Sequence, residues 1–250
     1  MNPQDRLIVA LDVPGFEQAR ELVGKLGDVV GTYKVGFQLF TAYGPFIVRF
    51  LQAQGKRVFL DLKFHDIPNT VASGVASAVT LSAPVHEALG PDAATTGMFS
   101  PLFMLTVHTQ GGVEMMRAAA QAALRRSSEL GVARPFIVGV TVLTSDAAAD
   151  NMETIVLERA RMAQAAGLDG VVASAREAAM LRRELGSDFI IVTPGIRPSG
   201  GDAGDQKRVE TPSSAIRQGA SYLVVGRPIV QAEDPARAAN EILAEIQAAL

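Results

Sequence analysis

Eight short runs of β-branched and other apolar residues recur along the chain, separated by longer segments of helical composition. Runs that are apolar at nearly every position are typical of strands buried on both faces, as in a parallel sheet covered by helices. Eight strand–helix units within 250 residues favour a closed (β/α)8 TIM barrel over an open doubly wound sheet. The predicted strands are residues 7–12, 32–37, 57–63, 103–108, 136–143, 169–174, 189–195 and 221–227.

The segments between these runs predict helices, among them residues 16–26, 113–130, 180–186 and 234–250. Asp234 and Pro235 suit the N-cap and the first helical position of the last helix. No linker or fixed-period repeat divides the sequence, so we expect residues 1–250 to form a single domain. Residues 82–102 are interrupted by Pro and Gly and predict an atypical surface excursion, to which no role is assigned.

Composition limits the classes of partner and of chemistry. The net charge of −3 provides no broad basic surface, which argues against nucleic acid or an anionic membrane as a partner. The absence of Cys excludes disulfides, Cys-ligated zinc and thiolate catalysis. The sequence shows neither a signal-peptide pattern at its start nor an apolar run of membrane-spanning length, so we expect a soluble, cytoplasmic protein.

Polar and turn-forming residues stand at nearly all of the predicted strand ends. Active sites of (β/α)8 barrels lie at the carboxyl ends of the strands. A single polar residue there is weak evidence, but a set spread over many strands favours a functional site. The set comprises Asp12, Lys34, Asp61, Lys63, His108, Thr144, Pro194, Gly195, Gly226 and Arg227.

The third strand ends in closely spaced charges. Asp61 and Lys63 are two residues apart and should share a face of the strand, with Asp66 just beyond its end. Nearby carboxylates favour the ammonium form of Lys63, whereas Schiff-base chemistry needs a neutral amine. A fixed ammonium can stabilise and then protonate a carbanion left by departing CO₂. The alternative is a structural ion pair at the end of a strand.

The last two predicted loops, 194–208 and 225–229, have the composition of an anion site. Gly226 allows a close backbone approach, and Arg227 offers a planar set of donors suited to phosphate oxygens. The longer loop is rich in glycine and contains Gln206, which suits a lid that closes on a ligand. The alternative is a flexible surface loop beside a strand that ends in arginine.

Eight motifs spread along the chain form an ordered set. They are "VALD" (9–12), "YKVGFQLF" (33–40), "DLKFHDIPNT" (61–70), "VH" (107–108), "TVLTS" (141–145), "TPGIRP" (193–198), "GDQKR" (204–208) and "VVGRPI" (224–229). Together they resemble the orotidine 5′-phosphate decarboxylase family in its bacterial type. The resemblance implies a (β/α)8 barrel that converts orotidine 5′-monophosphate to UMP and CO₂ in de novo pyrimidine biosynthesis without a cofactor.

The resemblance implies roles for the charged residues. Lys63 matches the family's lysine that protonates a vinyl-carbanion-like intermediate, and Asp61 matches the carboxylate beside the scissile group. Asp12 and Lys34 match residues that hydrogen-bond the ribose hydroxyls, and Lys34 also pairs with the Asp-Lys-Asp array. The resemblance further implies a homodimer, in which the neighbouring subunit's site receives Asp66, Ile67 and Thr70.

Other matches concern the pyrimidine ring and the phosphate. Thr144 and Ser145 fall where the family contacts the ring, and Pro194 and Ile196 would line the ring pocket. The phosphate grip and lid would comprise Arg197, Gln206, Gly226 and Arg227. The 82–102 segment is longer than expected for the family, so surface or oligomer details there are not transferred.

Two other functions use similar residues. A magnesium-dependent sugar-phosphate decarboxylase or aldolase shares the D-x-K-x-x-D array but needs an acidic ligand on the second strand, where this chain has Lys34. The spacing of His65 and His108 matches no zinc or facial-triad pattern, so no metal is expected. A non-catalytic barrel that binds nucleotide phosphates would not need so much clustered charge.

Overall fold

The computed structural model describes residues 2–83, 100–143, 151–198 and 210–250. Eight parallel strands pair in sequence order and close into one barrel, with β1 against β8, which confirms the predicted (β/α)8 fold. The strands are β1 (Leu7–Ala10), β2 (Thr32–Val35), β3 (Arg57–Phe64), β4 (Leu102–His108), β5 (Phe136–Val140), β6 (Gly170–Val172), β7 (Ile190–Thr193) and β8 (Tyr222–Val225).

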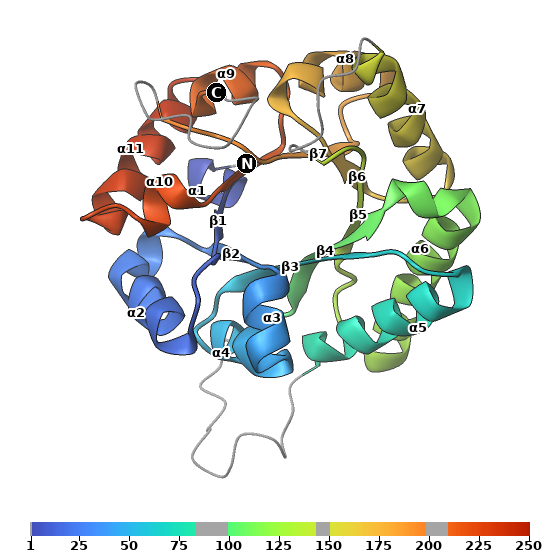
Figure 1. Ribbon diagram of the computed structural model, residues 1–250, viewed down its shortest axis with the longest axis horizontal. Helices are drawn as coiled ribbons and strands as arrows, with labels where there is room; N and C mark the ends of the chain where they lie inside the picture. The colour runs from blue at the N-terminus through green and yellow to red at the C-terminus, as the bar shows by residue number, and fades with distance from the viewer. Residues whose placement is uncertain (1, 84–99, 144–150, 199–209) are drawn as a thin grey trace.

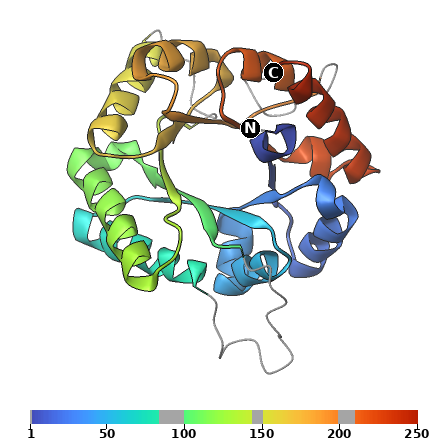
Figure 2. The same cartoon turned by 180° about the vertical axis from the view of Figure 1, so that it is seen from behind.

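Helices surround the ring of strands in both views of the molecule (Figures 1 and 2). No helix of the described ranges is both long enough and apolar enough to cross a membrane. The α-helices are α1 (Pro3–Arg6), α2 (Phe16–Leu26), α3 (Phe37–Tyr43), α4 (Pro45–Ala53), α5 (Pro68–Val79), α6 (Gly112–Leu130), α7 (Met152–Ala165), α8 (Ala175–Leu185), α9 (Pro212–Arg217), α10 (Arg227–Val230) and α11 (Pro235–Gln247).

The element boundaries differ from the sequence-based ones mainly at carboxyl ends of strands. The prediction placed Asp12 and Arg227 within strands, but β1 ends at Ala10 and Arg227 begins α10. α8 begins earlier than predicted because the Ser174 hydroxyl accepts a hydrogen bond from the Arg176 amide at 3.3 Å. The cap of α11 is confirmed, since Asp234 Oδ1 accepts from the Arg237 amide at 3.0 Å.

A second apolar core fills the barrel itself, separate from the larger core between the strands and the helices. It comprises Ile8, Ala10, Phe59, Met104, Val138, Val192, Tyr222 and Val224. Because strand side chains alternate between faces, the inward positions after Phe59 and Met104 are Asp61 and Thr106. The interior therefore changes from apolar to polar toward the carboxyl ends of β3 and β4.

Most of the predicted surface excursion, residues 84–99, lies outside the described residues. The residues before this interval are held by α4, where Arg49 donates to the carbonyls of Thr80, Leu81 and Ala83. After the interval, the Ser100 amide donates to the Gln52 carbonyl of the same helix. Leu102 N donates to Ser82 Oγ at 3.1 Å, which ties the two flanks together. The single-domain assignment of residues 1–250 stays a prediction.

Candidate active site

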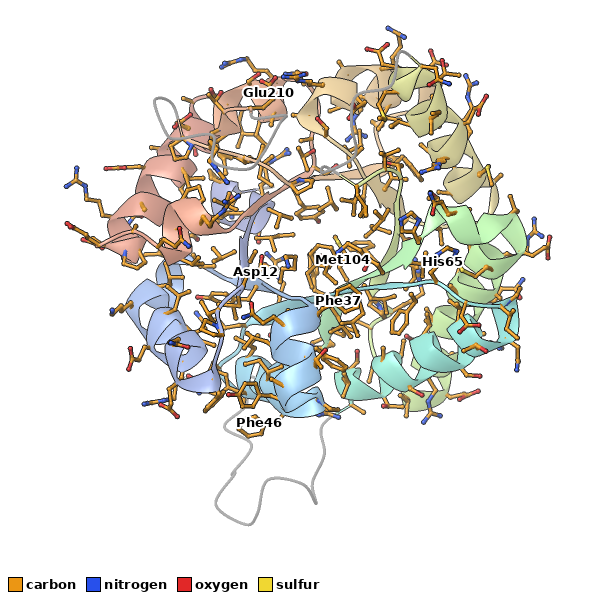
Figure 3. All side chains as sticks on the ribbon, in the orientation of Figure 1. Asp12, Phe37, Phe46, His65, Met104 and Glu210 are labelled. Atoms are coloured by element: carbon orange, nitrogen blue, oxygen red, sulfur yellow. The ribbon has the colours of Figure 1, made fainter. Side chains whose placement is uncertain are left out.

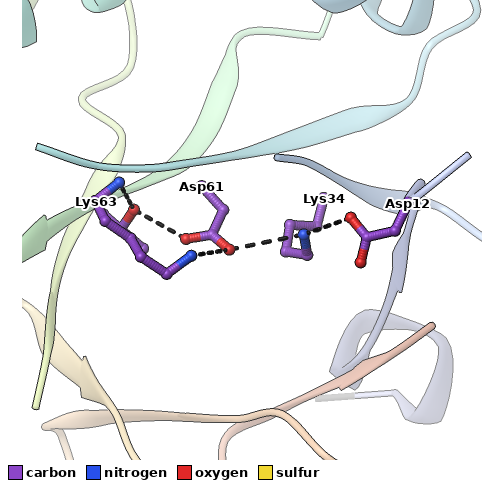
Figure 4. A network of polar contacts seen from close by, with 5 residues as sticks. Asp12, Lys34, Asp61 and Lys63 are labelled. Atoms are coloured by element: carbon purple, nitrogen blue, oxygen red, sulfur yellow. Dashed lines mark hydrogen bonds and ion pairs between the residues drawn. The ribbon is translucent and has the colours of Figure 1, made fainter. Parts of the chain in front are cut away.

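Four charged side chains of alternating sign form a row across the carboxyl ends of β1, β2 and β3 (Figure 4). Lys63 Nζ lies 2.9 Å from Asp61 Oδ2. Lys34 Nζ lies 3.6 Å from the same oxygen and 3.0 Å from Asp12 Oδ1. Each cation thus faces at least one carboxylate, which offsets the loss of hydration in this partly buried site.

The strands set the order of the row. Asp61 and Lys63 project to one side of β3 because they are two residues apart, as the sequence predicts. Lys34 on β2 is in register with Phe59 of β3, one inward position before Asp61. Ala10 of β1 is in register with Lys34, so the chain that leaves β1 brings Asp12 to the other side of the Lys34 ammonium.

The backbone of Lys63 has an unusual conformation. Its φ is +46°, and it is the one non-glycine residue with positive φ among the residues described. Such conformations are strained and are retained mainly at functional sites. The Lys63 amide donates at 2.7 Å to the hydroxyl of Thr106, a fully buried residue of β4.

Thr106 was missed by the reasoning from sequence. A signal was present, because Thr106 is a polar residue in the apolar run "FMLTVH", two positions before His108. That spacing puts it on the inward face of β4, close to the polar residues of β3.

A cavity of about 140 Å³ opens beside the row of charges. Lys34, Asp61 and Lys63 form its charged side. The remaining lining is apolar and consists of Phe59, Val140, Val142, Leu143, Val172, Pro194 and Val224. A cavity with one charged and one apolar side suits a flat ring that carries an anionic substituent.

The predicted ring and phosphate residues lie around β7 and β8. Pro194 lines the cavity, whereas Ile196 is fully buried in the larger core. Arg197 is 7% exposed and donates to the Ile196 carbonyl at 3.1 Å. A Cβ on Gly226 would lie 3.9 Å from Asp12 Oδ2, so the start of α10, with Arg227, lies near one end of the row.

Asp66, Ile67 and Thr70 are exposed at the start of α5. Asp66 Oδ1 accepts a hydrogen bond from the Ile67 amide at 2.6 Å. Within the parts of the chain that are described, no ion pair joins Asp66 to a cation. Asp66 therefore does not extend the row of charges inside its own subunit.

Two aromatic contacts border the site. The Lys63 ammonium lies 5.7 Å from the centre of the Phe37 ring, whose residue is 57% exposed. His65 and His108 stack with ring centres 5.4 Å apart. Asp12, Phe37 and His65 lie on the strand side of the helical layer in Figure 3, whereas Phe46 lies at the periphery.

Three predicted site residues, Thr144, Ser145 and Gln206, lie outside the described residues. Within residues 2–83, 100–143, 151–198 and 210–250, no group of three or more His, Cys, Asp or Glu side chains is arranged to hold a metal ion.

The closed barrel and the paired charges beside a cavity at the ends of its strands define a (β/α)8-barrel enzyme. Residues 5–242 match the family described as "Orotidine 5'-phosphate decarboxylase / HUMPS family". The chain belongs to this family.

Proteins of nearly the same length are similar to this chain over almost all of its residues. The chain is 47% identical to orotidine 5'-phosphate decarboxylase from Moorella thermoacetica, over 99% of this chain and 94% of that protein. It is 49% identical to the Afipia carboxidovorans protein of the same name, over 99% of this chain and 97% of that protein. The crystal structure of orotidine 5'-phosphate decarboxylase from Lactobacillus acidophilus superposes with a TM-score of 0.77 at 36% identity, covering 96% of this chain and 98% of that one.

Proposed function

We infer that this chain decarboxylates orotidine 5′-monophosphate to UMP and CO₂, a step of de novo pyrimidine biosynthesis. The observation that carries this function is the Lys63 ammonium, 2.9 Å from Asp61 at the wall of a cavity that is apolar on its other side. Membership of the decarboxylase family over nearly the whole chain supports the same reaction.

The reaction needs charge stabilisation followed by one proton. When the bond between the ring and the carboxylate breaks, its electron pair stays on the ring carbon and CO₂ leaves. The Lys63 ammonium stabilises this vinyl-carbanion-like intermediate and then donates a proton to the carbon, which completes UMP. Solvent reprotonates the neutral amine. No step of this scheme uses a cofactor.

Asp61 acts on the group that leaves. Its carboxylate would lie beside the carboxylate of the substrate, and the repulsion between them disappears as CO₂ forms. The contacts of Asp61 with both Lys63 and Lys34 support this role, because they hold its charge at the cavity wall.

The rest of the substrate would be held by residues around the cavity. Asp12 and Lys34 would bind the ribose hydroxyls, and Pro194 would contact the pyrimidine together with Ile196, Thr144 and Ser145. Arg197, Gln206, Gly226 and Arg227 would grip the phosphate. Binding energy gained at the phosphate, away from the reacting carbon, can drive closure of the site and so lower the barrier.

The active form would be a homodimer in which Asp66, Ile67 and Thr70 complete the partner's site. Their exposure beside the end of β3 supports this assembly, as does the lack of a cation partner for Asp66 among the described residues. Three large apolar side chains that follow the carboxyl ends of β2, β3 and β5 are also exposed, namely Phe37 at 57%, Ile67 at 66% and Leu143 at 42%. Contact across this end of the barrel would bury them.

The test is the loss of orotidine 5′-monophosphate absorbance with purified protein, in the presence and absence of EDTA. Rapid decay that is insensitive to EDTA and absent in Lys63→Ala is expected. Decay that EDTA stops and Mg²⁺ restores would point instead to the metal-dependent reaction. No decay from folded protein that binds UMP would indicate a binding barrel.

A further inference from the structure

Thr106 joins the two residues on which the proposed chemistry depends. Its hydroxyl accepts from the Lys63 amide at 2.7 Å and lies 3.0 Å from Asp61 Oδ1. Thr106 is fully buried on β4, 45 residues along the chain from Asp61.

The chemistry of the hydroxyl fixes the direction of both bonds. A backbone amide can only donate, so the Thr106 oxygen is the acceptor toward Lys63. The single hydroxyl hydrogen then points to Asp61 Oδ1. Asp61 Oδ1 is thereby occupied, and Oδ2 is left facing the two ammonium groups of Lys34 and Lys63.

The same hydroxyl supports the strained backbone at the end of β3. The pairing of β3 with β4 shifts register between Leu60 and Phe64, and Lys63 has its positive φ within this irregular stretch. An interruption of this kind re-aims a side chain. The Thr106 hydroxyl takes the Lys63 amide hydrogen in place of a backbone carbonyl, so this partly buried amide is satisfied in this conformation.

We propose that Thr106 is a positioning residue for the decarboxylation. It holds the Asp61 carboxylate and the Lys63 backbone in one arrangement, so that the ammonium and the carboxylate meet the substrate in fixed places. Thr106 is not one of the residues that line the cavity, and it acts through Asp61 and Lys63. This inference rests on the proposed function.

Thr106→Val tests the proposal because valine keeps the branched shape but removes the hydroxyl. We expect kcat to fall by about 100-fold, the effect of a small misplacement of reacting groups, while UMP affinity changes less than about threefold. Thr106→Ser keeps a hydroxyl at the same position, so its kcat should stay within about threefold of the unsubstituted protein.

Thr193→Val is the matched control. Thr193 is also a fully buried strand threonine, but its hydroxyl has no hydrogen-bond partner among the residues described. This variant should retain its kcat. The comparison separates the two hydrogen bonds of Thr106 from the general effect of replacing a buried threonine.

A crystal structure of Thr106→Val gives a readout that does not depend on turnover. We expect the φ of Lys63 to move to a negative value, or the Asp61 carboxylate to rotate away from Lys63. Unchanged geometry together with unchanged kcat overturns the proposal.

The series also distinguishes this proposal from the proposed function. A Thr106→Ser variant that loses kcat as Thr106→Val does, at an unchanged melting temperature, overturns the positioning role. If Thr106→Val does not fold, Thr106→Ser alone decides, and a fall in its kcat of about 100-fold at an unchanged melting temperature overturns the positioning role. Lack of turnover by the unsubstituted protein would refute the decarboxylase function itself.

Discussion

Lys63 Nζ lies 2.9 Å from Asp61 Oδ2, and both side chains come from the same face of β3. The same oxygen is shared with Lys34, whose ammonium also contacts Asp12. Two cations and two carboxylates therefore balance within the row before any substrate is bound. A phosphorylated substrate adds negative charge, which Arg227 near the other end of the row is suited to receive.

Lys63→Ala should remove the proposed proton donor and leave the cavity open. We expect kcat to fall by roughly 10,000-fold, the upper range for loss of a general acid, with UMP binding still measurable by calorimetry. Lys25→Ala, which removes an exposed lysine of α2, is the charge-matched control and should retain full turnover. Substantial residual turnover in Lys63→Ala would show that another group donates the proton.

Arg227→Ala should weaken the proposed binding of the substrate phosphate without unfolding the barrel, because Arg227 is only partly buried at the start of α10. Loss of one charged donor predicts a fall in kcat/KM of roughly 100- to 1,000-fold, or about 3 to 4 kcal/mol. Steady-state kinetics would measure it, with Arg217→Ala on α9 as the control. An unchanged kcat/KM would remove Arg227 from the site.

Mixing two inactive variants tests whether Asp66 serves the partner subunit. Lys63→Ala and Asp66→Asn should each be inactive alone. A mixed dimer contains one site with an intact Lys63 and an intact Asp66, so random exchange should restore about a quarter of the activity. Absence of recovery, although native mass spectrometry shows mixed dimers, would place Asp66 in its own subunit's site.

Tyr33→Phe should stabilise the protein. Tyr33 is fully buried, and its hydroxyl lacks a hydrogen-bond partner within the described ranges. Removing an unsatisfied buried group should raise the free energy of unfolding by about 1 kcal/mol at pH 7. Urea denaturation measures this change, and Tyr43→Phe, at a tyrosine that is 36% exposed, is the control.

The same variant should change the alkaline limit of stability. Burial raises the pKa of the Tyr33 phenol above its ordinary value of 10.0. Above pH 10 the unfolded chain loses this proton while the folded protein keeps it, so stability falls as pH rises, by up to about 1.4 kcal/mol per pH unit. The advantage of Tyr33→Phe over the unsubstituted protein should therefore grow above pH 10. A constant difference from pH 7 to 11 would contradict the assignment.

Local patterns in the sequence determined the barrel and part of its site. The eight apolar runs became the eight strands because near-continuous apolar character is what a strand buried on both faces requires. The shared face of Asp61 and Lys63 follows from the two-residue period of a strand. The cap at Asp234 likewise depends only on neighbours in the chain.

Tertiary structure decided the contacts that complete the site. Thr106 reaches Asp61 across 45 residues of sequence, and Lys34 reaches Asp12 across 22, because closure of the barrel brings separate strands together. The positive φ of Lys63 arises where the pairing of β3 with β4 shifts register, which no single segment encodes. Six of the eight strand ends were also placed too late in the sequence, because a strand ends where its hydrogen-bonded pairing with the neighbouring strand ends and not where the apolar residues end.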